Sequence, residues 1–198
     1  MMKKMMLIGC LMCLSVALCA QNLSVADNAA IDQKVDQFLK LIEQKNYTRL
    51  LDYMYPPIFE HSSKKEMFQV FNLLEQSGIE LKFKNLEILN KQNIETVNNT
   101  KYALVKYNLE MELPLTTDDL RGIAPLLVPV LKDNFGDENV IYDRANNYIN
   151  VKGEKFLMGI EDPTYSDWMF LIFDESFKSA ISKTIPGSVN QKASAIAY

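Results

Sequence analysis

The spacing of hydrophobic residues changes near residue 78 of this chain, and that change limits the folds open to it. Before residue 78, apolar side chains recur every three or four residues, which is typical of amphipathic helices. After it they alternate with polar side chains, as in strands that bury one face. Helices followed by a series of antiparallel strands predict an α+β fold.

Three helices are predicted before the change. The first is capped by Asp27 or Asn28, and its apolar stripe consists of Ile31, Val35, Phe38, Leu39 and Ile42. A short second helix with Leu50, Leu51 and Met54 inward ends at Pro56, because proline has no N–H to donate. Residues 63–66 form a capping box that opens the third helix.

The clearest predicted strand covers residues 101–113, and a phase slip after Asn85 predicts a β-bulge or a strand end before it. Its apolar face consists of Ala103, Val105, Tyr107, Leu109, Met111 and Leu113. Further strands are predicted at residues 140–143, 148–151, 155–161 and 167–173, with turns at Asn146–Asn147 and Lys152–Gly153. The last of these strands is apolar from Trp168 to Phe173, which predicts cover on both faces.

Residues 116–135 interrupt the strand pattern with a predicted helical insertion that Thr116 and Asp119 would cap. Pro125 and Pro129 are not expected within one unbroken helix, so two short or kinked pieces are predicted. After Pro186 the chain is small and polar, and we expect it to fray. The ordered part is therefore expected to cover about residues 28–185.

Residues 1–20 match a secretory signal peptide, with Lys3 and Lys4 followed by an apolar run and a small residue at Ala20. The run is shorter than the roughly 20 residues of a membrane-spanning helix, although an uncleaved anchor is an alternative. Residues 21–198 are expected to form a single α+β domain without a transmembrane span. The protein is expected to be exported, with the periplasm and the medium both open.

All three cysteines, Cys10, Cys13 and Cys19, lie within the predicted signal. Cleavage after Ala20 therefore leaves a chain that core packing must stabilise without disulfides. Lipid attachment at Cys19 is a minor alternative to ordinary cleavage, because Leu18 stands where a small residue is usual.

The net charge of the chain limits the classes of molecule that it is expected to bind. Removing Lys3 and Lys4 from the 21 basic residues leaves 19 against 25 acidic ones, a net charge of −6. An acidic chain without a basic cluster is not expected to bind nucleic acid or an anionic membrane surface.

Candidate catalytic and metal-binding residues are few. His61 is the only histidine, and with no cysteine in the mature chain the usual zinc patterns are missing. Asp118–Asp119 is interpreted as the acidic first turn of a helix, and Glu161–Asp162 as a strand end entering a turn. We therefore predict no catalytic residue, metal site or cofactor.

Tyr107 is the one hydroxyl-bearing side chain on the apolar face of residues 101–113, and a buried tyrosine hydroxyl usually has a partner. Together with Met111 and Trp168 it is predicted to mark an apolar ligand pocket with one polar group. A core tyrosine bonded to a backbone carbonyl is the alternative.

The order of elements over residues 28–175 resembles the nuclear transport factor 2-like superfamily. Residues 47–56 (YTRLLDYMYP) and 167–170 (DWMF) are similar to parts of small exported bacterial members of unassigned role. The resemblance implies a curved sheet that wraps a long helix into a cone with an internal pocket. Residues 116–135 depart from the family as an insertion, either a lid at the mouth of the cone or a cover for a sheet edge.

The superfamily includes isomerases, dehydratases, transport adaptors and ligand binders, so the fold leaves the function open. We expect a non-catalytic module that binds a small apolar or amphipathic ligand. One alternative is a protein-interaction module, for example a homodimer through the polar strand face of Lys106, Asn108 and Glu110. The other is an isomerase- or dehydratase-like enzyme that uses an acid with Tyr107 or His61.

Overall fold

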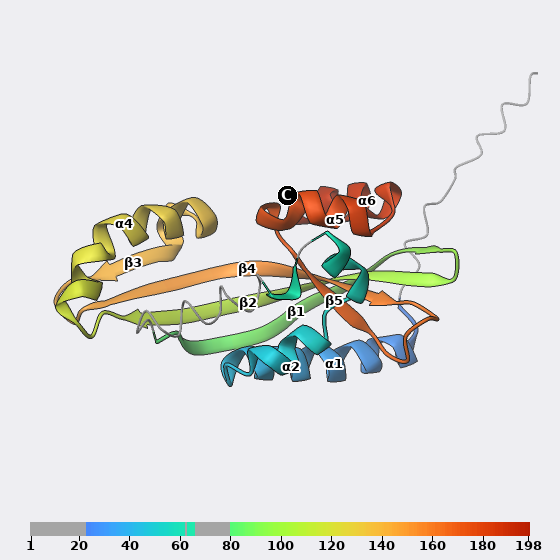
Figure 1. Cartoon of the computed structure of the whole chain (residues 1–198), viewed down its shortest axis with the longest axis horizontal. Helices are drawn as coiled ribbons and strands as arrows, with labels where there is room; N and C mark the ends of the chain where they lie inside the picture. Colours follow the sequence, from blue (N-terminus) through green and yellow to red (C-terminus); the bar gives the residue numbers. More distant parts are fainter. Residues whose placement is uncertain (1–22, 62, 66–79) are drawn as a thin grey trace, which may run out of the picture.

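The computed structural model describes residues 23–61, 63–65 and 80–198, which form a five-stranded antiparallel sheet with helices packed around it (Figure 1). This arrangement confirms the predicted α+β class. The predicted signal at residues 1–20 and most of the predicted third helix lie outside the described residues.

Three long strands form the body of the sheet: β1 (Lys82–Val97), β2 (Thr100–Pro114) and β4 (Tyr148–Glu161). Asn98 and Asn99 join β1 to β2 with positive φ, as a tight hairpin turn requires. The register between β1 and β2 shifts at three places, the first between Phe83 and Asn85, which confirms the predicted bulge. Bulges of this kind increase the twist of a strand pair.

The two short strands, β3 (Val140–Asp143) and β5 (Met169–Phe173), both pair with the edge of β4 that faces away from β2. β3 pairs as far as Val151, and the pairing with β5 begins at Phe156. Residues 152–155 of β4 therefore have no neighbouring strand on that edge among the described residues. The turn predicted at Lys152–Gly153 is wrong, because both residues continue β4 opposite β2.

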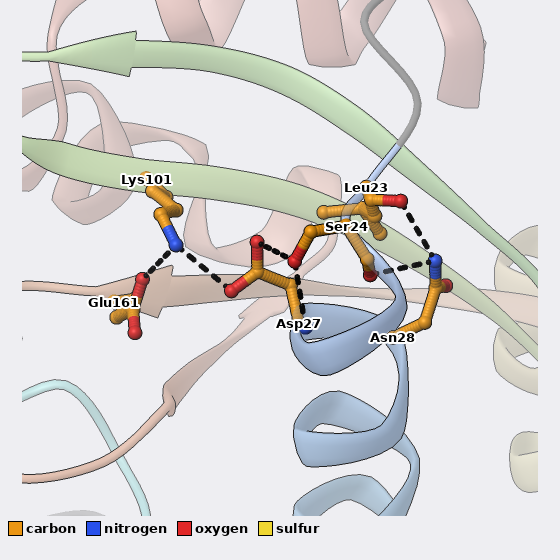
Figure 2. Close-up of polar contacts among 6 residues, drawn as sticks. All are labelled: Leu23, Ser24, Asp27, Asn28, Lys101 and Glu161. Atoms are coloured by element: carbon orange, nitrogen blue, oxygen red, sulfur yellow. Dashed lines mark hydrogen bonds and ion pairs between the residues drawn. The ribbon is translucent and has the colours of Figure 1, made fainter.

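Helix α1 (Val25–Glu43) packs against the sheet with the predicted apolar stripe inward, and Ile31, Val35 and Phe38 are fully buried. Its N-cap is Ser24, not the predicted Asp27 or Asn28. Asp27 instead reaches Lys101 of β2 at 2.8 Å, and Lys101 also contacts Glu161 at 2.7 Å (Figure 2). This ion-pair network ties the start of α1 to two strands.

Two short helices follow α1. Asn46 caps α2 (Tyr47–Asp52), and Pro56 begins the 3₁₀ helix η1 (Pro56–Glu60) where the predicted second helix was expected to stop. Met54 forms an isolated β-bridge with Phe170 of β5, which holds the segment of α2 and η1 at the edge of the sheet.

Helix α4 (Asp118–Phe135), followed by η2 (Asp137–Asn139), is one continuous helix containing both Pro125 and Pro129, so the predicted division into two short helices is wrong. Both prolines are exposed, and the opposite side of the helix packs on the sheet through Leu120 and Ala124. This packing compensates for the two missing backbone bonds. The cap is Thr117 rather than Thr116.

The chain closes with η3 (Glu175–Phe177), α5 (Lys178–Thr184) and α6 (Gly187–Ala197). The expectation of a frayed tail after Pro186 is wrong, because residues 187–197 form α6. Val189 and Ala193 lie one helical turn apart and are fully buried, because small side chains allow α6 to approach the sheet closely. Figure 1 shows α5 and α6 on the opposite side of the sheet from α1 and α2.

The hydrophobic core has two parts. The larger joins α1, α5 and α6 to one end of the sheet, and the smaller joins α4 and β3 to the other end. On β4 the larger part ends at Leu157 and the smaller at Val151, with Gly153 and Lys155 between them. The unpaired edge of the sheet thus coincides with the boundary between the two cores.

Candidate functional site

A cleft lies over the unpaired edge of β4, between the end of α4 and the end of α6. It consists of two adjoining cavities of about 330 and 510 Å³ that share Asn134, Glu154 and Lys155. Figure 1 shows α4 and the pair α5–α6 standing apart above β4, with the end of the chain at the end of the pair that is nearer to α4. The size is in the range of small-molecule sites, roughly 300–1,000 Å³.

Lys155 stands at the centre of this cleft. Its ammonium lies 3.0 Å from the Asp174 carboxylate, and both side chains are about four-fifths covered (21% and 22% exposed). The ammonium also donates to the backbone carbonyl of Asn134 at 3.3 Å and lies 4.4 Å from the ring centroid of Phe135. One cation therefore joins β4, the end of α4 and the segment after β5.

Asp174 follows β5 directly and caps η3, accepting hydrogen bonds from the backbone N–H and the hydroxyl of Ser176. Burial on its own would raise the pKa of the Asp174 carboxyl, but the bonds from Ser176 and Lys155 outweigh it. The pKa is lowered overall, so this carboxylate is held in its charged form.

Tyr107 lies opposite Lys155 on β2. Burial and the nearby charge of Asp174 raise the pKa of its phenol, which keeps the hydroxyl protonated. Among the hydrogen bonds of the described residues, none involves this hydroxyl. Tyr107 is therefore a neutral polar residue of the larger core at the strand position opposite Lys155.

An aromatic wall closes the side of the cleft near α6. The rings of Phe173 and Tyr198 are stacked with centroids 6.4 Å apart, and Phe156 lies opposite Phe173 on β4. The carboxylates of Asp133, Glu154 and Glu175 stand around the opening. The cleft thus combines apolar surface with charged groups that are able to orient a ligand.

The ligand site predicted from the sequence consists of Tyr107, Met111 and Trp168. In the structure these residues belong to two different parts of the core. Tyr107 and Trp168 belong to the larger core, whereas Met111 belongs to the smaller one. Trp168 packs over Gly159, where an added Cβ would lie 3.3 Å from its ring. None of the three lines the two cavities of the cleft. Their role in ligand binding stays a prediction.

Lys155 and Asp174 were missed because they are far apart in the chain and belong to no short motif. The sequence contains one indication of this site, because the charged segment Lys152–Lys155 separates two apolar stretches that belong to one strand. We interpreted that interruption as a turn, whereas it marks the unpaired part of the edge.

The other candidates occupy structural positions. His61 is exposed at the end of η1, and Asp118 and Asp119 form the acidic first turn of α4. Asp162 accepts a hydrogen bond from the Tyr55 hydroxyl at 2.7 Å, which lowers the pKa of its carboxyl, and it bonds the backbone of Thr164 in the turn after β4. No group of three potential metal-ligating side chains occurs within residues 23–61, 63–65 and 80–198.

No helix in the described part of the chain is both long enough and apolar enough to span a membrane. Comparison with protein-family models, with curated proteins and with solved structures finds no significant match for this sequence.

Proposed function

We propose that this chain is an exported bacterial protein that binds a small amphipathic molecule in the cleft above Lys155 without transforming it. The observation that carries this proposal is the gap in the sheet edge at residues 152–155. A strand within a sheet directs its N–H and C=O groups to both neighbours, so the gap leaves backbone groups of β4 without strand partners at the cleft floor. Such groups are available to a ligand or to water.

The lining supports an amphipathic ligand. Phe156, Phe173 and Tyr198 offer apolar and aromatic surface, while Lys155 and Asp174 offer one charge of each sign. Apolar walls with a few fixed polar groups are the usual composition of small-molecule sites. The signal peptide expected at residues 1–20 supports a location in the periplasm or the medium.

The titration behaviour of the cleft supports binding rather than acid–base catalysis. General acids and bases work best with a pKa near the operating pH. The pKa of Asp174, which lines the cleft, is lowered, and the pKa of Tyr107, which lies in the adjoining core, is raised, so neither group exchanges its proton readily near neutrality. His61, the other candidate base, does not line the cleft.

We further propose membership of the nuclear transport factor 2-like superfamily. The bulged antiparallel sheet and the packing of α1 on one of its faces support this assignment. Helix α4 occupies the predicted insertion and borders the cleft, which favours the lid interpretation of residues 116–135. An NMR structure that places residues 66–79 away from α1 would contradict a cone built from three N-terminal helices.

The test of ligand binding is native mass spectrometry of the protein purified from its own envelope fraction, with a denaturing mass of the same sample. We expect a small-molecule adduct on the native mass only. The variant Asn134→Trp, which fills the cleft from α4, should lose the adduct. The matched control Gln44→Trp, at the exposed end of α1, should keep it.

A clean native mass for the parent, or an adduct that survives Asn134→Trp, would refute the cleft as the ligand site. A denaturing mass that carries acyl chains from Cys19 onward would instead support the lipoprotein alternative.

A further inference from the structure

Helix α4 buries one face and leaves a second apolar face uncovered. Ile123, Leu126 and Val130 follow one another at intervals of three and four residues and are 38%, 73% and 58% exposed. We name these three residues the α4 stripe. An amphipathic helix of a soluble protein normally carries polar residues on the side away from the core.

Gly122 of α4 lies next to the stripe and has open space beside it. A Cβ added to Gly122 would meet nothing within 4 Å, and Gly136 is the one glycine with positive φ among the described residues. Glycine inside a helix costs about 1 kcal/mol relative to alanine. Gly122 therefore leaves room for close approach of a second backbone beside the stripe.

The charges around the stripe have one sign. Asp119 and Asp133 lie at its two ends on the same side of the helix, both exposed and without an ion pair among the described residues. The basic residues of α4 are engaged elsewhere, Arg121 with Asp118 and Lys132 with Asp137 at 3.1 Å. The stripe is therefore an apolar surface with a negative charge at each end.

We propose that the α4 stripe docks an amphipathic helix of a partner protein whose apolar face is flanked by lysine or arginine at both ends. The i, i+3, i+7 spacing suits ridges packed into the grooves of another helix, and Gly122 permits a close crossing. Acidic residues at both ends match basic residues on the partner.

The same charges disfavour two other occupants. A second copy of this chain, packed stripe to stripe, would bring acid against acid in the parallel and in the antiparallel orientation. An anionic membrane surface would be repelled by both ends. This proposal is independent of ligand binding in the cleft, because Ile123, Leu126 and Val130 line neither of its two cavities, and Leu126→Glu should therefore leave the ligand adduct in place.

The test measures binding of two synthetic helical peptides to the mature chain by fluorescence anisotropy. Both peptides carry leucines on one face; one has two lysines at each end, and the other has two glutamates. We expect the lysine-ended peptide to bind more tightly, with an affinity that falls as salt rises.

Leu126→Glu should weaken binding of the lysine-ended peptide about tenfold or more, as expected for a central apolar contact. The control Val25→Glu replaces another exposed aliphatic residue, on α1, and should bind as the parent does. Asp119→Asn should weaken binding about two- to fivefold and reduce the salt dependence, which is the range of a rim charge pair.

Equal binding of the two peptides, equal loss in Leu126→Glu and Val25→Glu, or no binding at millimolar peptide would overturn the proposal. A dimer that Leu126→Glu dissociates would assign the stripe to a second copy instead. Binding to vesicles of mixed zwitterionic and anionic phospholipid that Leu126→Glu abolishes would assign it to a membrane.

Discussion

Lys155 and Asp174 meet at 3.0 Å across the space between β3 and β5, where no strand pairs with β4 on that edge in the described structure. Each side chain is mostly covered, so the pair is screened less by solvent than a surface ion pair. It fastens the end of β5 to the middle of β4 at the boundary between the two cores.

Replacement of Asp174 by asparagine should lower the free energy of unfolding by about 1–2 kcal/mol at pH 7, because charged hydrogen bonds to Lys155 and Ser176 are lost. The folded-state pKa of Asp174 is lowered, so its contribution is present above the unfolded value near 3.9 and disappears as pH falls through the folded value. Urea unfolding of parent and variant from pH 7 to pH 2.5 should therefore show converging stabilities. Asp119→Asn is the exposed control, and equal behaviour of the two variants would contradict the expectation.

Tyr107→Phe should change the free energy of unfolding by less than about 0.5 kcal/mol at pH 7, because its hydroxyl has no hydrogen bond among the described residues. The pKa of Tyr107 is higher in the folded state than in the unfolded state, where it is near 10. The contribution of Tyr107 to the free energy of unfolding is therefore fully present below about pH 10 and is lost as the pH rises above that value. Parent and variant should have equal stability up to about pH 9.5, and the parent should lose more above pH 10. Urea unfolding between pH 7 and pH 11 checks this, and parallel decline would count against a buried phenol.

Gly153→Ala should lower the free energy of unfolding by about 1–3 kcal/mol, because the new Cβ would lie 2.9 Å from the Phe135 ring. Phe135→Leu in the same chain should recover part of this loss, giving a favourable coupling in a double-mutant cycle. The control is Gly122→Ala, which has open space and should raise stability by up to about 1 kcal/mol. Additive effects at residues 153 and 135 would show that the contact is not the cause.

Pro125→Ala should raise the free energy of unfolding by about 1–2 kcal/mol. The substitution restores a backbone bond within α4, and the gain is reduced by the greater freedom of the unfolded chain. Far-ultraviolet circular dichroism with urea unfolding checks the effect. Pro163→Ala, in the exposed turn after β4, should instead be neutral or destabilising. A loss of stability in Pro125→Ala would mean that α4 depends on the proline ring.

Local periodicity was sufficient for most of the elements. The stripe of Ile31, Val35 and Phe38 predicts α1, and the alternation through Tyr107 predicts β2, because burial of one face depends only on residue spacing. The phase slip at Asn85 likewise predicts the bulge in β1. Predictions failed where tertiary packing stabilises a helix that its residues disfavour locally. This is so at Pro125 and Pro129 in α4 and for the small residues of α6.

The sequence by itself determined the α+β class, the position of β2 and the acidic first turn of α4, because each depends on neighbouring residues. The expectation that only one face of β2 is covered is wrong at Tyr102 and Leu104, which tertiary packing buries on the other face. Only the tertiary structure decided that β3 and β5 share one edge of β4 and that, in the described part of the chain, residues 152–155 have no strand partner on that edge. The cleft, the Lys155–Asp174 pair and the stacking of Phe173 with Tyr198 follow from that pairing. Such contacts join segments that are distant in the chain, and no local spacing specifies which distant partner a strand takes.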